Sequence, residues 1–97
     1  MSRRAVITGL GVVSAYGVGL DALWAGLSSG RSALGPVRSF DASGFACAAG
    51  GEAEGVSAKD AVPKTYRKFV RVMARDTELA VVAAAQAVGD AGLTNLR

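Results

Sequence analysis

Histidine is absent from this 97-residue chain, and cysteine occurs once, at Cys47. Without histidine the chain holds neither a Ser-His-Asp set nor a Cys-His set, and histidine-based metal sites are excluded as well. A single cysteine excludes an internal disulfide framework and leaves too few soft ligands for a zinc site. If the chain belongs to an enzyme, the groups that transfer protons lie elsewhere in that enzyme.

Long hydrophobic runs are also missing. Hydrophobic residues make up 51% of the chain, but no apolar run approaches the roughly 18 to 20 residues that span a bilayer. The basic start at residues 1–4 leads into a strand-like segment with glycines rather than into a signal-peptide core. We therefore expect a cytoplasmic protein that has no membrane partner and enough apolar residues for a modest core.

The patterning predicts one small α/β unit over residues 1–97, at the low end of length for an independent fold. A Val- and Ile-rich segment predicts a strand over about residues 4–13. Apolar side chains at helical spacing predict a helix over about residues 19–29: Leu20, Leu23, Trp24 and Leu27. Residues 30–63 predict a loop or short hairpin, and a helix is expected over about residues 65–90. Gly30 and Gly92 mark the ends of the two helices.

The first half of the predicted helix over residues 65–90 carries a group of cations. At 100° per residue they fall within an arc of about 100° and form one basic stripe: Lys64, Arg67, Lys68, Arg71 and Arg75. The stripe carries more charge than the net +3 of the whole chain, so the remaining residues sum to a negative charge. The stripe is either a solvated helix face or a docking surface for an acidic partner. Without interleaved aromatics it gives little support for nucleic-acid binding.

The second half of that helix, residues 79–88, has a single polar residue, Gln86. A helix that is apolar all the way round is buried on every side. One strand and one short helix cannot surround it. Either the segment pairs with another chain, or these residues are the first part of a larger protein.

Two further features resemble parts of functional sites but lack residues that those sites need. Gly9 and Gly11 lie where the predicted strand runs into a turn, as in a dinucleotide-binding loop. Ser14 replaces the third glycine of that motif, however, and a tight structural turn is favoured. Cys47 lies among small residues like a nucleophile, yet no histidine or helix start is present to activate it. We interpret it as a buried or incidental thiol. No catalytic residue, cofactor site or metal site is predicted.

Taken together, these pieces resemble the N-terminal end of a β-ketoacyl-[acyl-carrier-protein] synthase of the synthase II type, in the thiolase-like superfamily. The opening RRAVITGLGVVSAYG is similar to the family's strand-and-turn signature. Trp24-x-x-Leu27, Gly30-Arg-Ser and Phe40-Asp41 follow in the family's order. The closing Met73…Asp90-Ala-Gly-Leu93 resembles its buried central helix, whereas the run from Tyr66 to Asp76 departs from the commonest wording.

The resemblance implies a fragment of a layered αβαβα fold in which this helix lies between two sheets. It implies decarboxylative Claisen condensation in fatty-acid or polyketide biosynthesis, by a cysteine and two histidines that lie beyond residue 97. Cys47 precedes the central helix and is out of order for that nucleophile, so the chain is not catalytic alone. The implied partners are an acyl carrier protein and the remainder of the synthase or a homodimer partner.

For docking the carrier protein, Lys68 and Arg71 match the family positions best, with Lys64, Arg67 and Arg75 on the same face. The alternatives are a non-catalytic chain-length-factor-like subunit and a stand-alone carrier-protein-binding module. A nucleotide-binding half-domain is disfavoured, because Ser14 replaces the third glycine that its phosphate-binding loop needs.

Overall fold

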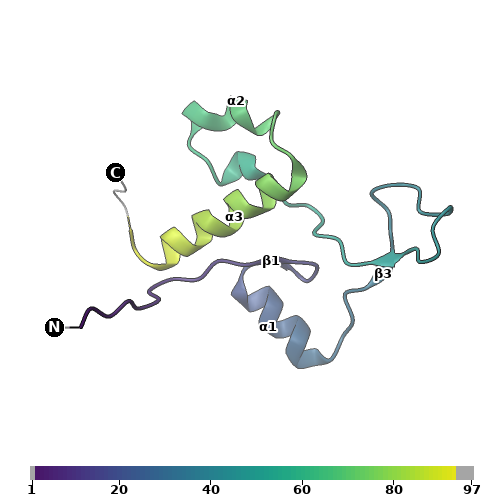
Figure 1. Ribbon diagram of the computed structural model, residues 1–97, viewed down its shortest axis with the longest axis horizontal. Coiled ribbons are helices and arrows are strands. Elements are labelled where there is room, and N and C mark those ends of the chain that lie inside the picture. Colours follow the sequence, from purple (N-terminus) through teal and green to yellow (C-terminus); the bar gives the residue numbers. More distant parts are fainter. Residues whose placement is uncertain (1, 94–97) are drawn as a thin grey trace.

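The computed structural model describes residues 2–93, in which helices and short strands are joined by long extended segments (Figure 1). In chain order the elements are β1 (Val13–Ser14), β2 (Gly17–Val18), α1 (Leu20–Ser29), β3 (Gly35–Pro36), β4 (Ala49–Gly50), η1 (Ala58–Asp60), η2 (Lys64–Tyr66), α2 (Arg67–Val70) and α3 (Arg75–Asp90). The radius of gyration is 16.6 Å, against about 12.5 Å for a compact domain of this length. The described residues therefore leave much of their apolar surface uncovered.

The strand expected over residues 4–13 forms a ladder only at its end. β1 pairs antiparallel with β2, Val13 opposite Val18, around a turn at Ala15 and Tyr16. Upstream of β1 the backbone has no partner strand among the described residues, so the expected boundaries are wrong for this structure. A Val- and Ile-rich sequence favours extended backbone, but a strand exists only where a neighbour completes its hydrogen bonds.

Instead of a strand, helix α3 lies along the N-terminal segment (Figure 1). The N–H of Leu10 donates to Oδ2 of Asp90 at 3.0 Å, and the N–H of Val12 donates to Oε1 of Gln86 at 3.3 Å. The two donors are spaced like the two acceptors, because alternate residues of an extended chain lie about 6.6 Å apart and helix residues four apart lie about 6 Å apart. The single polar residue of the apolar half of α3 thus anchors the N-terminal segment. The Nε2 of Gln86 is buried and has no hydrogen-bond partner among residues 2–93.

Gly9 and Gly11 permit this close approach. The backbone makes no turn at residues 9–12, and neither glycine has a positive φ. The tight turn expected at these glycines is therefore wrong, and the turn lies downstream between β1 and β2. A Cβ on Gly9 would lie 2.5 Å from the backbone nitrogen of Ala91, and one on Gly11 would lie 2.7 Å from that of Ala87. Glycine is needed here for contact between two backbones.

Helix α1 runs over Leu20–Ser29, within the residues expected for it, and ends at Gly30 in the left-handed conformation (φ 71°). Gly26 is its one buried residue, because the ring of Tyr16 lies where a Cβ would be. The Tyr16 hydroxyl donates to the carbonyl of Arg31, just beyond the helix. Leu23 is half-buried, but the rest of the apolar face of α1 is uncovered, and Trp24 is 72% exposed.

A single helix over residues 65–90 is wrong. The chain forms η2, α2 and α3, with a break at Ala74, whose ψ of 158° is extended. The core explains the break: Val70 and Val82 join one cluster with Val56 and Ala58, although a straight helix would separate them by about 18 Å. The break lets both valines pack into the same small core, and burying them is favourable. Local helix propensity does not include this tertiary contribution, so it does not predict the break.

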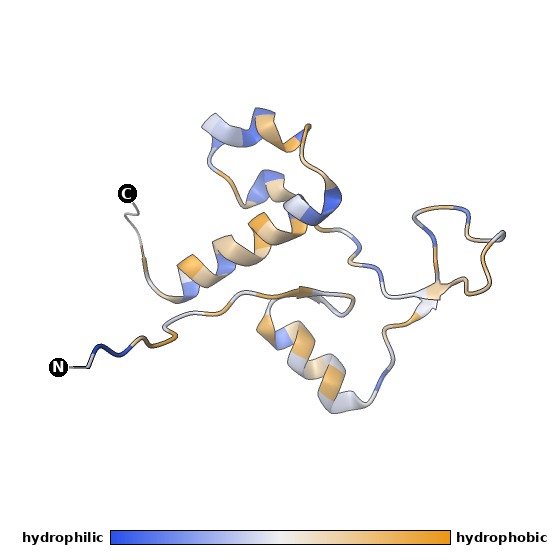
Figure 2. Cartoon of the chain, in the orientation of Figure 1, coloured by the Kyte–Doolittle hydropathy of each residue, from blue (hydrophilic) through white to orange (hydrophobic). Residues whose placement is uncertain are grey.

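The end of α3 agrees with the sequence. Gly92 adopts φ 73°, and the N–H groups of Gly92 and Leu93 donate to the carbonyls of Gly89 and Val88 at 3.1 and 3.2 Å. This is a Schellman motif, which requires a left-handed residue after the helix. Between its ends α3 buries only Val82, and its other apolar residues are exposed or half-buried. Figure 2 shows that hydrophobic residues recur along the length of α3.

Candidate functional site

The predicted basic side chains do not form one helix stripe, since the helix that would align them is broken. Lys64 lies in η2, Arg67 and Lys68 lie in α2, Arg71 caps α2, and Arg75 begins α3. All are exposed. Their roles in the structure differ, and the difference divides them into two groups.

Arg75 is an internal clasp. Its Nη1 donates to the carbonyl of Val56 at 2.7 Å and to Oε1 of Glu78 at 2.6 Å, and its Nη2 donates to the carbonyl of Ala53 at 2.6 Å. Oε2 of Glu78 accepts from the N–H of Ala58 at 3.0 Å. The pair fastens residues 53–58 to the start of α3.

This clasp makes stability depend on pH through Glu78. The N–H of Ala58, then Arg75, lowers the pKa of Glu78 below its ordinary value of 4.5. A carboxyl with a lower pKa in the folded state contributes stability above the unfolded pKa and loses it as pH falls through the folded one.

We therefore expect Glu78→Gln to be less stable than the parent at neutral pH. The difference should begin to shrink as pH falls below about 4.5, and it should be lost only once pH has passed below the lowered pKa of Glu78 in the folded state. Thermal unfolding of both proteins across roughly pH 2–7 measures this difference, because the contribution of Glu78 should change within that range. Glu54→Gln is the control, because Glu54 makes only a long ion pair with Arg38, at 3.9 Å. A constant difference at all pH values would contradict the role of the Glu78 charge.

Arg67 is also tied within the chain, since its Nε donates to the carbonyl of Lys59 at 3.1 Å. Lys64, Lys68 and Arg71 form no salt bridge within residues 2–93. The ammonium of Lys68 lies 5.3 Å from the ring centre of Phe69, a cation–π distance. Of the five predicted cations, these three are available to an acidic partner.

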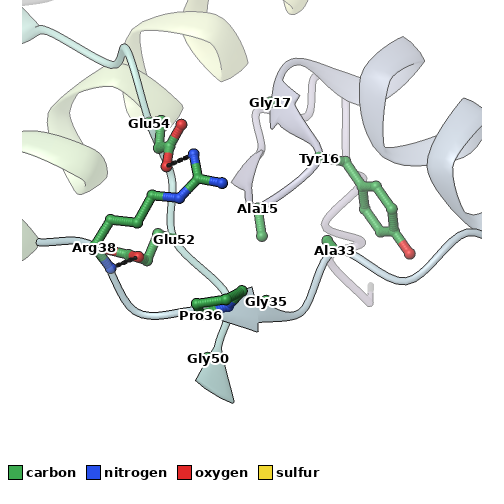
Figure 3. Close-up of a pocket in the computed structure, with 10 residues that line it drawn as sticks. All are labelled: Ala15, Tyr16, Gly17, Ala33, Gly35, Pro36, Arg38, Gly50, Glu52 and Glu54. Carbon is green, nitrogen blue, oxygen red and sulfur yellow. Dashed lines mark hydrogen bonds and ion pairs between the residues drawn. The ribbon is translucent and has the colours of Figure 1, made fainter. Parts of the chain in front are cut away.

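A cleft of about 350 Å³ lies between the β1–β2 turn and the β3–β4 ladder (Figure 3). Its charged groups have partners within the chain. The carboxylate of Glu52 accepts from the backbone N–H groups of Arg38 and Ser39 at 2.6 and 3.0 Å, and the guanidinium of Arg38 lies 3.9 Å from the carboxylate of Glu54. Hydrogen bonds from Ser39 and from the Arg38 backbone lower the pKa of Glu52. The carboxylate holds the loop after β3 in place.

Cys47 lies in the loop between β3 and β4 and is exposed, so a buried thiol is wrong. Its Sγ lies 3.6 Å from the carbonyl of Ala49. Within residues 2–93, His, Cys, Asp and Glu side chains form no group of three or more that could hold a metal. In the same residues, every helix is too short or too polar to cross a membrane.

Sequence reasoning missed the partners of Arg75 and of the N-terminal segment. The three-residue spacing of Arg75 and Glu78 indicates a helical ion pair, but nothing local predicts that both also bind backbone of residues 53–58. Gln86, the lone polar residue of its segment, was a visible signal for an anchoring contact.

Comparison with known proteins gives the family. Residues 2–97 match the family model described as "Beta-ketoacyl synthase, N-terminal domain". The chain is 43% identical over 91 residues to 3-oxoacyl-[acyl-carrier-protein] synthase 2 of Synechocystis sp., with 94% of this chain and 21% of that protein covered. It is 38% identical over 88 residues to the tetracenomycin polyketide synthase ketoacyl synthase beta subunit of Streptomyces glaucescens, with 91% and 21% covered.

The structure agrees with these sequence relations. It superposes on a chain of the ishigamide ketosynthase/chain length factor with a TM-score of 0.73 and 38% identity, covering 92% of this chain and 21% of that one. The chain thus spans about a fifth of the length of the relatives it matches. Its mixed helices and strands are those of a thiolase-like α/β fold. The chain belongs to the β-ketoacyl synthase family, and its residues 2–97 match that family's N-terminal domain.

Proposed function

We propose that this chain acts as the N-terminal part of a 3-oxoacyl-[acyl-carrier-protein] synthase and contributes a docking surface for the acidic carrier protein. The reaction is a decarboxylative Claisen condensation, whose cysteine and histidines the remainder of the synthase supplies. The open surface of α3 supports assembly with more protein, because a segment with so few polar residues gains by burial on every side. The partners are therefore the rest of the synthase and the carrier protein.

The observation that carries the docking role is the availability of Lys64, Lys68 and Arg71 on η2 and α2. Of the five cations that the sequence pattern singled out, these three bind no carbonyl or carboxylate within residues 2–93. Charge complementarity speeds encounter and fixes orientation more than it adds affinity. A surface of this kind suits a partner that must arrive and leave once per condensation.

Reversing two of these charges tests the docking role. We expect Lys68→Glu combined with Arg71→Glu, in the synthase that carries this domain, to weaken carrier-protein binding about tenfold at low salt. The loss should shrink as salt rises, because screening removes the favourable and the unfavourable charge effects alike. Titration calorimetry at several salt concentrations measures both the affinity for the carrier protein and its dependence on salt. Unchanged affinity and salt dependence would rule out docking at this surface.

A second candidate is a non-catalytic, chain-length-factor-like subunit with the same fold. It is favoured by the names of two similar proteins, one a ketoacyl synthase beta subunit and the other a ketosynthase/chain length factor. A condensation assay of the assembled protein, with malonyl-carrier protein as substrate, separates the two. Product formation supports the synthase, and its absence despite carrier binding supports the subunit. A stand-alone carrier-binding module would require cooperative unfolding of the 97-residue chain itself, which circular dichroism with heat and urea would detect.

A further inference from the structure

The short helix η1 packs against α2 and carries a further cation, Lys59, which the sequence pattern did not include. The Nε of Arg67 donates to the carbonyl of Lys59, so α2 and η1 are joined directly. Lys59 is exposed, and within residues 2–93 its ammonium takes part in no hydrogen bond or salt bridge. Figure 2 shows hydrophilic residues on both η1 and α2.

The acidic neighbour of Lys59, Asp60, forms no salt bridge with it within residues 2–93. Asp60 lines a separate cleft of about 450 Å³, beside Val56 and Val82. Lys59 also helps to lower the pKa of Glu78, as the smallest of the causes, but that carboxylate already binds Arg75 and Ala58. The Lys59 charge is thus available to a partner.

We infer that Lys59 is a docking contact for the acidic carrier protein, acting with Lys68 and Arg71 across two elements, and that Arg67 is the positioning residue that holds η1 against α2. This inference rests on the proposed docking function. A contact spread over η1 and α2 fits a partner whose carboxylates extend beyond the width of one short helix. Charges on two joined elements also fix the partner's orientation, which a single row of charges leaves free to slide.

Single-charge neutralisation in the assembled synthase tests Lys59. We expect Lys59→Gln to weaken carrier-protein binding about two- to fivefold at low salt, as Lys68→Gln does, which is the range for exposed charge pairs. Arg38→Gln removes the same charge from the β3–β4 side and should leave binding unchanged. Asp60→Asn alters the neighbouring charge on the cleft side and should also leave it unchanged.

The outcomes separate this inference from the proposed function. If Lys68→Gln weakens binding and Lys59→Gln does not, the role of Lys59 is overturned and docking at α2 stands. If neither weakens binding, the docking function itself fails. Arg67→Lys keeps the charge but loses the Nε bond to Lys59, so reduced affinity with an unchanged salt slope supports positioning. Unaltered affinity would contradict it.

Discussion

Gly11→Ala is expected to lower the free energy of unfolding by about 2 kcal/mol, the middle of the range for inserting a group into a packed interface. The new Cβ would overlap the carbonyl of Ala83 and lie 2.7 Å from the backbone nitrogen of Ala87. Backbone cannot move aside as a flexible side chain can. The N-terminal segment would therefore lift from α3, and the hydrogen bond from the N–H of Val12 to Gln86 would break.

The matched control is Gly89→Ala. Gly89 lies in α3, and a Cβ there would meet nothing within 4 Å. Alanine favours helix over glycine, so this variant should be more stable by about 0.5 kcal/mol. Thermal unfolding gives the stabilities, and hydrogen exchange at Leu10 and Val12 reports the contact itself. Equal effects of the two substitutions would show that the N-terminal segment does not pack on α3.

Arg75→Ala is expected to release residues 53–58 from the start of α3. The carbonyls of Ala53 and Val56 would lose their donors, at a cost of about 1 kcal/mol or more, even with partial exposure to water. The loss matters to the core, because Val56 and Ala58 belong to its only cluster of buried residues in the part of the chain described. Faster hydrogen exchange at residues 56–58 and a lower thermal midpoint should follow.

Arg38→Ala is the comparison for this effect. Arg38 also pairs with a glutamate, but at 3.9 Å with both side chains largely exposed, and such pairs contribute about 0–1 kcal/mol. Arg75→Lys should recover charge but not stability, since an ammonium cannot reach two carbonyls and a carboxylate in the geometry of a guanidinium. Similar destabilisation by Arg38→Ala and Arg75→Ala would refute the clasp.

The sequence by itself determined the elements whose signals are local. The helix ending at Gly30 and the close of α3 at Gly92 follow from glycine's access to the left-handed conformation. The absence of histidine excluded the catalytic sets that depend on it, whatever the fold. The ordered motifs also identified the family, because they are a property of the chain and need no coordinates.

Only the tertiary structure decided which groups meet. The break at Ala74 arises because Val70 and Val82 both reach the same core, a gain that depends on residues distant in the chain. The same packing turned Arg67 and Arg75 into internal ties and left Lys68 and Arg71 available. Gly9 and Gly11 became contact glycines because α3 lies against them. Contacts between distant segments depend on the path of the whole chain, and the propensities of individual residues do not determine that path.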